Sequence, residues 1–309
     1  MSNSILTNAS AMTALQTLNA TNANMSEVQN RISTGQRVSS AEDNAAYWSI
    51  ATTMRSDNSA LSAVQDALGL GAATVDTMYT AMNSTVEVVD EIKAKLVAAK
   101  QPGVDRGKIQ SDISELQNQL QTIADSAVFN SENWLSTDAS ATGYSATKSV
   151  VSSFSRAGGA ITISTIDIDT TATQLFEAST QAGVLDKART AAAGNMIGDS
   201  VATIDISAIT DDAADTAALD AAISDVDAAM AEITDSATLL GSVKKRIDLQ
   251  KDFVSALTDA LDRGIGQLVD ADMNEESTRL KALQVQQQLG IQALSIANSN
   301  SENILSLFR

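Results

Sequence analysis

This chain of 309 residues contains no cysteine and no histidine, and it contains a single proline. Without cysteine there is no disulfide, no thiolate nucleophile and no thiolate metal site, and the redox compartment of the protein is left open. Without histidine the chain also lacks the commonest general base and metal ligand. We therefore expect a protein that is not an enzyme and that holds no cofactor and no metal.

Aromatic residues are also scarce, at 3% of the chain, although hydrophobic residues make up 44%. The apolar share is therefore mostly alanine, valine, leucine and isoleucine, a composition that favours long helices packed side by side. No run of about 20 apolar residues is present, so we expect no membrane insertion. The first residues lack the basic and continuous apolar regions of a secretory signal peptide, so export needs another route.

Positive charge is limited as well: 20 basic residues stand against 38 acidic ones, which gives a formal net charge of −18. Attraction to a phosphate backbone needs clustered lysine and arginine, so nucleic acid is not an expected partner. The only basic cluster, Lys244 to Arg246, is predicted to pair with a neighbouring helix. Between residues 190 and 243 every charged residue is acidic, which predicts a separate, well-solvated module.

The two ends of the chain carry almost no charge of either sign. Residues 1–26 and 282–301 contain no aspartate, glutamate, lysine or arginine. Helices that face water normally carry charges on one side, so uncharged amphipathic helices indicate surfaces that take partners. The apolar positions that recur at helical spacing are Ile5, Met12, Leu15, Leu18, Met25, Val28 and Ile32 near the start, and Leu280, Leu283, Leu289, Ile291, Leu294, Ile296, Leu305 and Phe308 near the end.

Helix signals extend inward from both ends. The first helix is predicted to stop at Gly35, and a second to start near Ser40 and run to about Lys100, because serine and acidic residues there match capping boxes. Pro102 and Gly103 predict a turn before a third helix over 109–123. Asp272 and Glu275 are expected to cap the last helix.

The middle of the chain has mixed signals. Residues 160–169 alternate strictly and predict one strand of a hairpin, and residues 201–206 predict another strand. Residues 174–193 and 215–233 are predicted helices, and a further helix runs from Leu239 onward. The fold class is therefore mainly α: a long antiparallel helical coiled-coil rod built from both chain ends, with a small α+β outer module inserted in the middle.

Two sequence blocks then carry a family resemblance. The segment from Arg31 to Ala46, RISTGQRVSSAEDNAA, resembles the N-terminal signature of bacterial flagellins, and the blocks at 269–273, 286–290 and 297–309 are similar to the C-terminal one. The resemblance covers roughly the first 135 and last 70 residues. The matching signature positions are Arg31, Ser33, Gly35, Arg37, Ser40, Asp43, Ala45, Ala46, Asp270, Asp272, Glu276 and Asn298.

This resemblance implies a structural subunit that polymerises into the extracellular flagellar filament used for motility, after export, unfolded, by the flagellar type III route. The implied partners are other copies of the chain, a flagellar export chaperone, hook-junction and cap proteins, and sister flagellins. The apolar positions of both ends become subunit-interface residues. The implied organisation is an inner-tube domain (1–39 with 275–309), a rod domain (40–140 with 236–274) and a variable outer domain (141–235).

Two other functions stay open at this point. A hook-filament junction protein of the same export system shares the end patterns, but it joins or caps and does not make long filaments. An enzyme displayed in the variable region is a remote third possibility, since histidine and cysteine are both absent. Electron microscopy of the purified protein after adding salt or seeds separates the first two.

Overall fold

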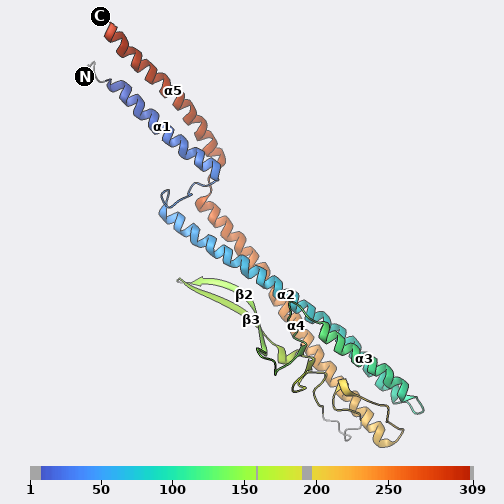
Figure 1. The fold of residues 1–309 in the computed structure, drawn as a ribbon. Helices are drawn as coiled ribbons and strands as arrows, with labels where there is room; N and C mark the ends of the chain where they lie inside the picture. Colours follow the sequence, from blue (N-terminus) through green and yellow to red (C-terminus); the bar gives the residue numbers. More distant parts are fainter. Residues whose placement is uncertain (1–7, 158, 190–196, 307–309) are drawn as a thin grey trace. The chain divides into compact units, whose positions relative to one another are not determined.

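A computed structural model describes residues 8–157, 159–189 and 197–306, with only the backbone of residues 300–306. Ile5 and Phe308 lie outside the described residues, and the side chain of Leu305 is not described. The helices are α1 (Ala9–Thr34), α2 (Ala45–Ala99), α3 (Arg106–Ser126), α4 (Ala213–Val269) and α5 (Met273–Ser306) (Figure 1). The strands are β1 (Ser136–Thr137), β2 (Thr147–Ala157), β3 (Ala160–Asp169) and β4 (Phe176–Glu177).

The chain forms two compact units, each held by its own internal contacts. The first unit contains residues 1–59 and 258–309, and the second contains residues 60–257. In the first unit α1 and α5 pack against each other as an antiparallel pair. In the second unit parts of α2 and α4 run antiparallel, because Lys93 pairs with Asp227 whereas Lys100 pairs with Asp220.

The core of the second unit is a set of apolar side chains repeated every three, four or seven residues. Apolar repeats of this kind place one stripe of each helix toward its neighbours. The fully buried members are Leu68, Val75, Met78, Met82, Val89, Ile92 and Leu96 of α2, Ile113 and Leu120 of α3, and Leu219, Val226, Ile233, Leu240 and Ile247 of α4. Lys244 pairs with Asp76 of α2, as predicted for the basic cluster.

The predicted hairpin is present as β2 paired with β3 in antiparallel register. Val150 of β2 and Ile166 and Ile168 of β3 are buried. Val150 fits against the backbone of α2 at Gly71, where a Cβ atom would collide with the valine methyl groups. A register shift between Val151 and Ser153 marks an irregularity in the ladder, so the two ends of the hairpin present different faces.

The prediction of a helix over residues 174–193 is wrong for the described residues, 174–189. The chain there forms the short strand β4, which pairs in parallel with β1, followed by turns. Gln181 adopts a positive φ of 54°, which interrupts a right-handed helix. The carboxylate of Glu177 instead accepts hydrogen bonds from the backbone N–H groups of Ala139, Ser179 and Thr180. A side chain thus satisfies backbone groups that a helix would have paired. Residues 190–193 lie outside the described residues.

The strand predicted over 201–206 is also wrong. Residues Val201–Thr203 form the 3-10 turn η2, and Val201, Ile204 and Ile206 are buried at intervals of three and two residues, which departs from the period of two of a strand. The backbone partners of this segment include glutamine side chains of α3, and the Ala202 and Asp205 N–H groups donate to the Leu185 and Ile197 carbonyls. Gln117 donates to the Val201 and Ile204 carbonyls, and Gln110 accepts from the Ile206 N–H at 2.9 Å. No neighbouring strand is therefore needed to satisfy its backbone.

Two helix boundaries differ from the sequence prediction. The second helix starts at Ala45 rather than near Ser40, because the Asn44 side chain caps it by accepting from the Ala46 and Tyr47 N–H groups, both at 3.1 Å. The two helices expected over 215–233 and from Leu239 are one helix, α4. The prediction of a mainly α fold with a small strand-containing middle region is confirmed. No described helix is long and apolar enough to cross a membrane.

Candidate assembly interface

The first unit carries the two helices that contain the uncharged segments, and the ends of these helices are fixed by local sequence. Asn8 caps α1: its Oδ1 accepts from the Ala11 N–H at 3.0 Å, while its Nδ2 donates to the Ala297 carbonyl of α5 at 2.9 Å. The helix ends at Gly35, whose φ of 73° lies in the left-handed region and whose N–H reaches the Arg31 carbonyl. Glycine adopts that conformation without steric cost, as the sequence predicted.

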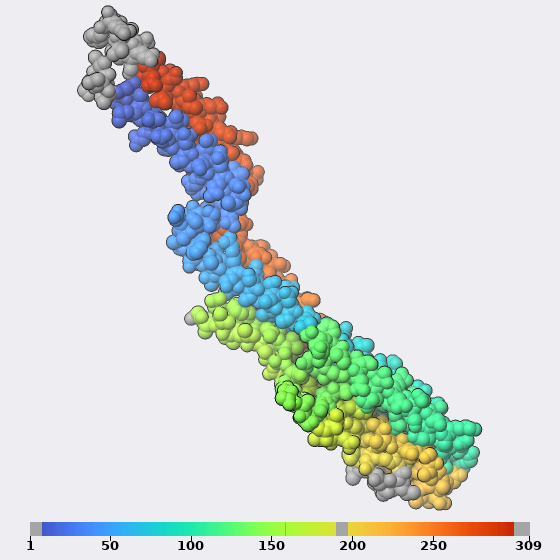
Figure 2. Space-filling model, in the orientation of Figure 1, coloured from blue at the N-terminus to red at the C-terminus, as the bar shows by residue number. Residues whose placement is uncertain are grey.

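Uncharged polar groups and a close approach set the register of α1 against α5. Gln287 Nε2 donates to Asn22 Oδ1 at 2.8 Å. One turn further, Gly290 lies against Leu18, because a Cβ atom on that glycine would lie 3.3 Å from Leu18 Cδ1. Figure 2 shows the blue surface of α1 lying along the red surface of α5. The pair is therefore held without charges over this part of its length.

The predicted interface residues divide into two groups within the single chain. The first group is buried or partly buried within the chain; it contains Leu18, Met25, Val28, Ile32, Leu280, Leu283 and Leu294. The other group is exposed; it contains Met12, Leu15, Leu289, Ile291 and Ile296. Ile296 is 62% exposed and Met12 is 64% exposed. Two helices alone thus leave large apolar side chains on an uncharged surface, which is typical of a surface that a partner covers.

Signature residues from the two ends of the chain contact each other where α1 ends and α5 begins. Arg31 Nη1 lies 3.2 Å from Glu276 Oε1, and Arg31 Nη2 also pairs with the exposed Glu27 one turn away in α1. Glu276 is 6% exposed. A buried carboxylate is tolerated when a cation pairs with it, so the arginine gives α1 and α5 a specific anchoring point.

Backbone hydrogen bonds join the two signature segments next to this ion pair. Gln36 and Asp270 form an isolated antiparallel bridge, and the Ala271 N–H donates to the Gly35 carbonyl at 2.9 Å. Arg37 Nη2 donates to the Leu268 carbonyl at 3.2 Å in the last turn of α4. A cation at this position is favourable because the unpaired carbonyl groups make a helix C-terminus negative.

Asp43 organises the turn before α2. Its carboxylate accepts from the N–H groups of Ser40 and Ser39, at 3.0 Å and 2.9 Å. These hydrogen bonds hold the pKa of Asp43 below its usual value, and the bond from the Ser40 N–H has the largest effect. They lower the pKa because they stabilise the charged form of the carboxyl group. Asp272 caps α5 as predicted, accepting from the Asn274 N–H at 2.8 Å. The remaining signature residues Ser33, Ala45, Ala46 and Asn298 are exposed.

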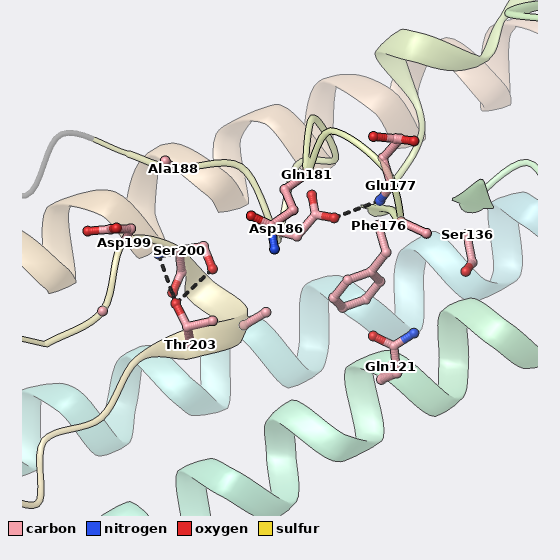
Figure 3. A pocket seen from close by; sticks show the side chains of 13 residues that line it. Gln121, Ser136, Phe176, Glu177, Gln181, Asp186, Ala188, Asp199, Ser200 and Thr203 are labelled. Atoms are coloured by element: carbon pink, nitrogen blue, oxygen red, sulfur yellow. Dashed lines mark hydrogen bonds between the residues drawn. The ribbon is translucent and has the colours of Figure 1, made fainter. Parts of the chain in front are cut away.

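A polar hollow of about 650 Å³ in the second unit is the alternative site (Figure 3). It is lined by Gln121, Phe176, Glu177 and Asp186, with polar residues around η2. The pKa of Glu177 lies far below its usual value. The main cause is the hydrogen bonds that its carboxylate accepts from the Ser179 and Thr180 hydroxyl groups. Burial raises the pKa of Asp186, and its Oδ2 accepts from the Glu177 N–H at 2.7 Å.

The acidic residues that line the hollow are better explained by a structural role than by a catalytic one. Glu177 has its acceptor positions filled by backbone and hydroxyl donors, so it is not free to take a proton from a substrate. Among the described residues no three acidic side chains gather closely enough to hold a metal ion. The uncharged helix pair is therefore the candidate functional site.

In this helix pair the N-terminal and C-terminal segments of the chain are fixed to each other, and an uncharged apolar surface is left exposed. This combination is typical of a self-assembling structural protein. Comparison with known families agrees. The model described as the bacterial flagellin N-terminal helical region matches residues 5–140, and the bacterial flagellin C-terminal helical region matches residues 223–308. Residues 141–222 lie outside both.

Curated relatives match over nearly the whole chain. Flagellin C of Rhizobium meliloti (strain 1021) is 54% identical over 320 residues, covering 99% of each protein. Flagellin A of Rhizobium meliloti is 47% identical over 400 residues, covering 99% of this chain and all of that protein. A flagellin of Brucella melitensis biotype 1 is 47% identical over 307 residues, covering 99% of each.

The chain therefore belongs to the bacterial flagellins. These are structural proteins of the extracellular flagellar filament and not enzymes. The resemblance of the two end blocks is confirmed, and so is the expectation of a structural rather than catalytic role.

Proposed function

We propose that this chain polymerises through its two uncharged ends, with α1 and α5 of each copy packed among those of its neighbours. The observation that carries the proposal is a set of exposed apolar side chains on the uncharged segments of α1 and α5: Met12, Leu15, Leu289, Ile291 and Ile296. Burying an unpaired charge between copies costs several kcal/mol, whereas neutral polar groups are satisfied by hydrogen bonds.

The proposed organisation places residues 1–39 and 275–309 in the inner tube around the channel. Residues 40–140 and 236–274 form the rod, and residues 141–235 form the outer domain. The lack of a family match between residues 141 and 222 supports a variable outer module, because a segment that copies do not share as an interface is free to change.

A single charge at the interface tests the proposal. Leu15 is 48% exposed in the subunit, so Leu15→Glu leaves the fold of the second unit unchanged but places a charge between copies. We expect filament formation to be lost. Leu289→Glu is the matching change in α5, because Leu289 is 58% exposed in the subunit. Filaments of normal heat stability from either variant would mean that the assembly core lies elsewhere.

Two controls separate charge from other effects. Leu15→Gln removes the same apolar contact without adding charge, so it should weaken assembly less than Leu15→Glu. Ala228→Glu adds a charge at an exposed position of α4 and should leave assembly unchanged. Sedimentation and electron microscopy of seeded filaments measure the outcome for each variant, and circular dichroism checks that the subunit is folded.

We further propose that the chain is exported unfolded by the flagellar type III route and meets an export chaperone, hook-junction and cap proteins, and sister flagellins. A fusion to a small domain that resists unfolding should block its export, while a fusion to an easily unfolded variant of the same domain should pass. Equal export of both would contradict an unfolded route.

A hook-filament junction role is the alternative. Identity of 54% along 99% of a protein named flagellin favours the filament role. Purified chain should grow long filaments from seeds without another protein, because each added copy recreates the surface for the next. Growth that stops after short caps or collars would favour the junction role instead.

A further inference from the structure

The sulfur chemistry of this chain belongs to methionine alone, because cysteine is absent. Seven methionines fall among the described residues, and their exposure differs widely. Met12 is 64% exposed and Met273 is 39% exposed, whereas Met78 and Met82 have no exposed surface. The remaining three are partly buried: Met25, Met54 and Met230. Because susceptibility to oxidation follows exposure, a dissolved oxidant meets Met12 more readily than any other methionine of the described residues.

Met12 lies on the side of α1 that the first unit leaves open. The buried residues of α1 are Thr21 and Val28. Counted from Met12 at about 100° per residue, these two positions lie about 180° and 160° away around the helix. A surface hollow of about 560 Å³ opens beside Met12, and its lining includes Leu15 and Asn19. The thioether of Met12 is thus accessible to a small solute in the single subunit.

The same residue belongs to the proposed assembly surface. Met12 and Leu15 are exposed apolar side chains in a segment that has no charged residue before Glu27. An unbranched thioether adapts its shape to a neighbouring surface and is therefore common in such contacts. A chemical change at this sulfur consequently alters the surface that takes another copy, while the core of the subunit stays untouched.

The change is a two-electron oxidation with hydrogen peroxide as the oxidant. The thioether sulfur attacks one peroxide oxygen, and the O–O bond breaks. The sulfur gains that oxygen as a sulfoxide and gives two electrons to the peroxide. The proton of the transferred oxygen moves to the departing hydroxide, which leaves as water. A flexible apolar side chain thereby becomes polar and chiral.

Resting on the proposed polymerisation, we propose that Met12 is an oxidation site that controls assembly. A subunit with the sulfoxide adds poorly to a filament, because burying the new oxygen requires a hydrogen-bond donor and a close-packed contact has no room prepared for it. In an assembled subunit a second copy covers the thioether. Peroxide therefore stops the growth of new filament and spares filament that has already formed.

A methionine replacement tests the site directly. Peroxide treatment of the unaltered subunit should raise the critical concentration for seeded growth at least about tenfold, the effect of one unsatisfied buried polar group. Met12→Leu keeps a similar apolar volume, so it should assemble normally and resist peroxide. Met273→Leu is the matched control and should stay sensitive. Equal loss of growth in treated Met12→Leu and in the treated unaltered chain would overturn the proposal.

A second measurement uses the unaltered chain alone. Mass spectrometry of peptides reports the rate at which each methionine gains an oxygen. In depolymerised subunits Met12 should oxidise fastest of the described methionines, and Met78 and Met82 should oxidise slowest. In filaments the oxidation of Met12 should be at least about tenfold slower, since susceptibility follows exposure. Equal rates for Met12 in filaments and in subunits would overturn its covering by a second copy.

Reversal separates this site from general damage. Methionine sulfoxide reductases with a dithiol remove the oxygen as water, while the dithiol becomes a disulfide, and they should restore growth. Growth that stays lost after Met12 has been reduced would contradict the proposal. Met12→Gln places an uncharged polar group there without any oxidant and should weaken growth in the same direction. If the untreated, unaltered chain makes no filaments, the proposed function fails instead, so the two failures are distinguished.

Discussion

Arg31 and Glu276 lie 245 positions apart in the sequence, and 3.2 Å separates Nη1 of the arginine from Oε1 of the glutamate. Both were identified from the sequence only as signature residues of opposite ends. Their pairing explains why the two signatures occur together: each supplies one half of the contact that fixes α1 to α5. Glu276 Oε2 is buried and has no hydrogen-bond partner among the described residues, so the carboxylate depends on Arg31.

The first prediction concerns this ion pair. Arg31→Ala should destabilise the α1 and α5 pair by about 1–3 kcal/mol, because it leaves a buried carboxylate without a partner. Faster hydrogen exchange of α1 amides around Val28, and a lower temperature of filament disassembly, measure the effect. Glu27→Ala is the control: Glu27 is an exposed partner of the same arginine, and its loss should cost less than about 0.5 kcal/mol. Equal effects of both changes would contradict the assigned role of Glu276.

The second prediction concerns the end of α1. Gly35 has a φ of 73°, and nothing lies within 4 Å of where its Cβ would be. Gly35→Ala should therefore cost about 1–2 kcal/mol through backbone strain alone, seen as a lower melting temperature of the first unit. Gly35→Asn should cost less, because asparagine tolerates the left-handed region. A steric explanation predicts instead that asparagine, which is larger, is the worse of the two.

The third prediction compares two glycines of one helix. A Cβ on Gly71 collides with Val150 of the hairpin, whereas nothing lies near the corresponding position on Gly69. Gly69→Ala should stabilise the second unit by about 0.5–1 kcal/mol, the usual gain in a helix interior. Gly71→Ala should destabilise it, because β2 must move. Thermal unfolding of the two variants is the measurement, and stabilisation by both would show that Val150 does not pack closely on α2.

The fourth prediction concerns pH and Glu177. Its pKa in the folded chain lies below the usual value of 4.5. The carboxylate therefore stabilises the fold above that pH, and the contribution is lost as the pH falls below 4.5 toward the folded value. Glu177→Gln should lower the melting temperature at pH 7, and the difference from the unaltered chain should shrink on acidification. A difference that does not change between pH 7 and pH 3 would contradict the assignment.

The sequence by itself predicted the elements whose signals are local. The stop of α1 at Gly35, the cap of α5 at Asp272 and the hairpin strand over 160–169 depend on residues a few positions apart, and all three are confirmed. The start of α2 was predicted five residues too early, because two serine and acid pairs imitate a capping box. In the structure Asp43 closes the preceding turn, and Asn44 caps the helix.

The middle module was predicted less well because its backbone partners are distant. Residues 201–206 were predicted to be a strand, but Gln110 and Gln117 of α3 supply several of their backbone hydrogen bonds across more than 80 positions of sequence. The segment after residue 174 contains helix-forming residues, yet the turn made by the Glu177 carboxylate redirects it. No local pattern reports the position of such side chains.

The sequence alone therefore determined that this protein is helical and that its ends are uncharged, because composition and periodicity act along the chain, and it predicted that those ends take partners. Only the tertiary structure decided which apolar residues the chain itself buries and which it leaves exposed. Leu18 and Leu15 have the same residue type and lie in one predicted stripe, but Leu18 packs on Gly290 whereas Leu15 stays half exposed. The physical reason is that one neighbouring helix can cover only one side of another.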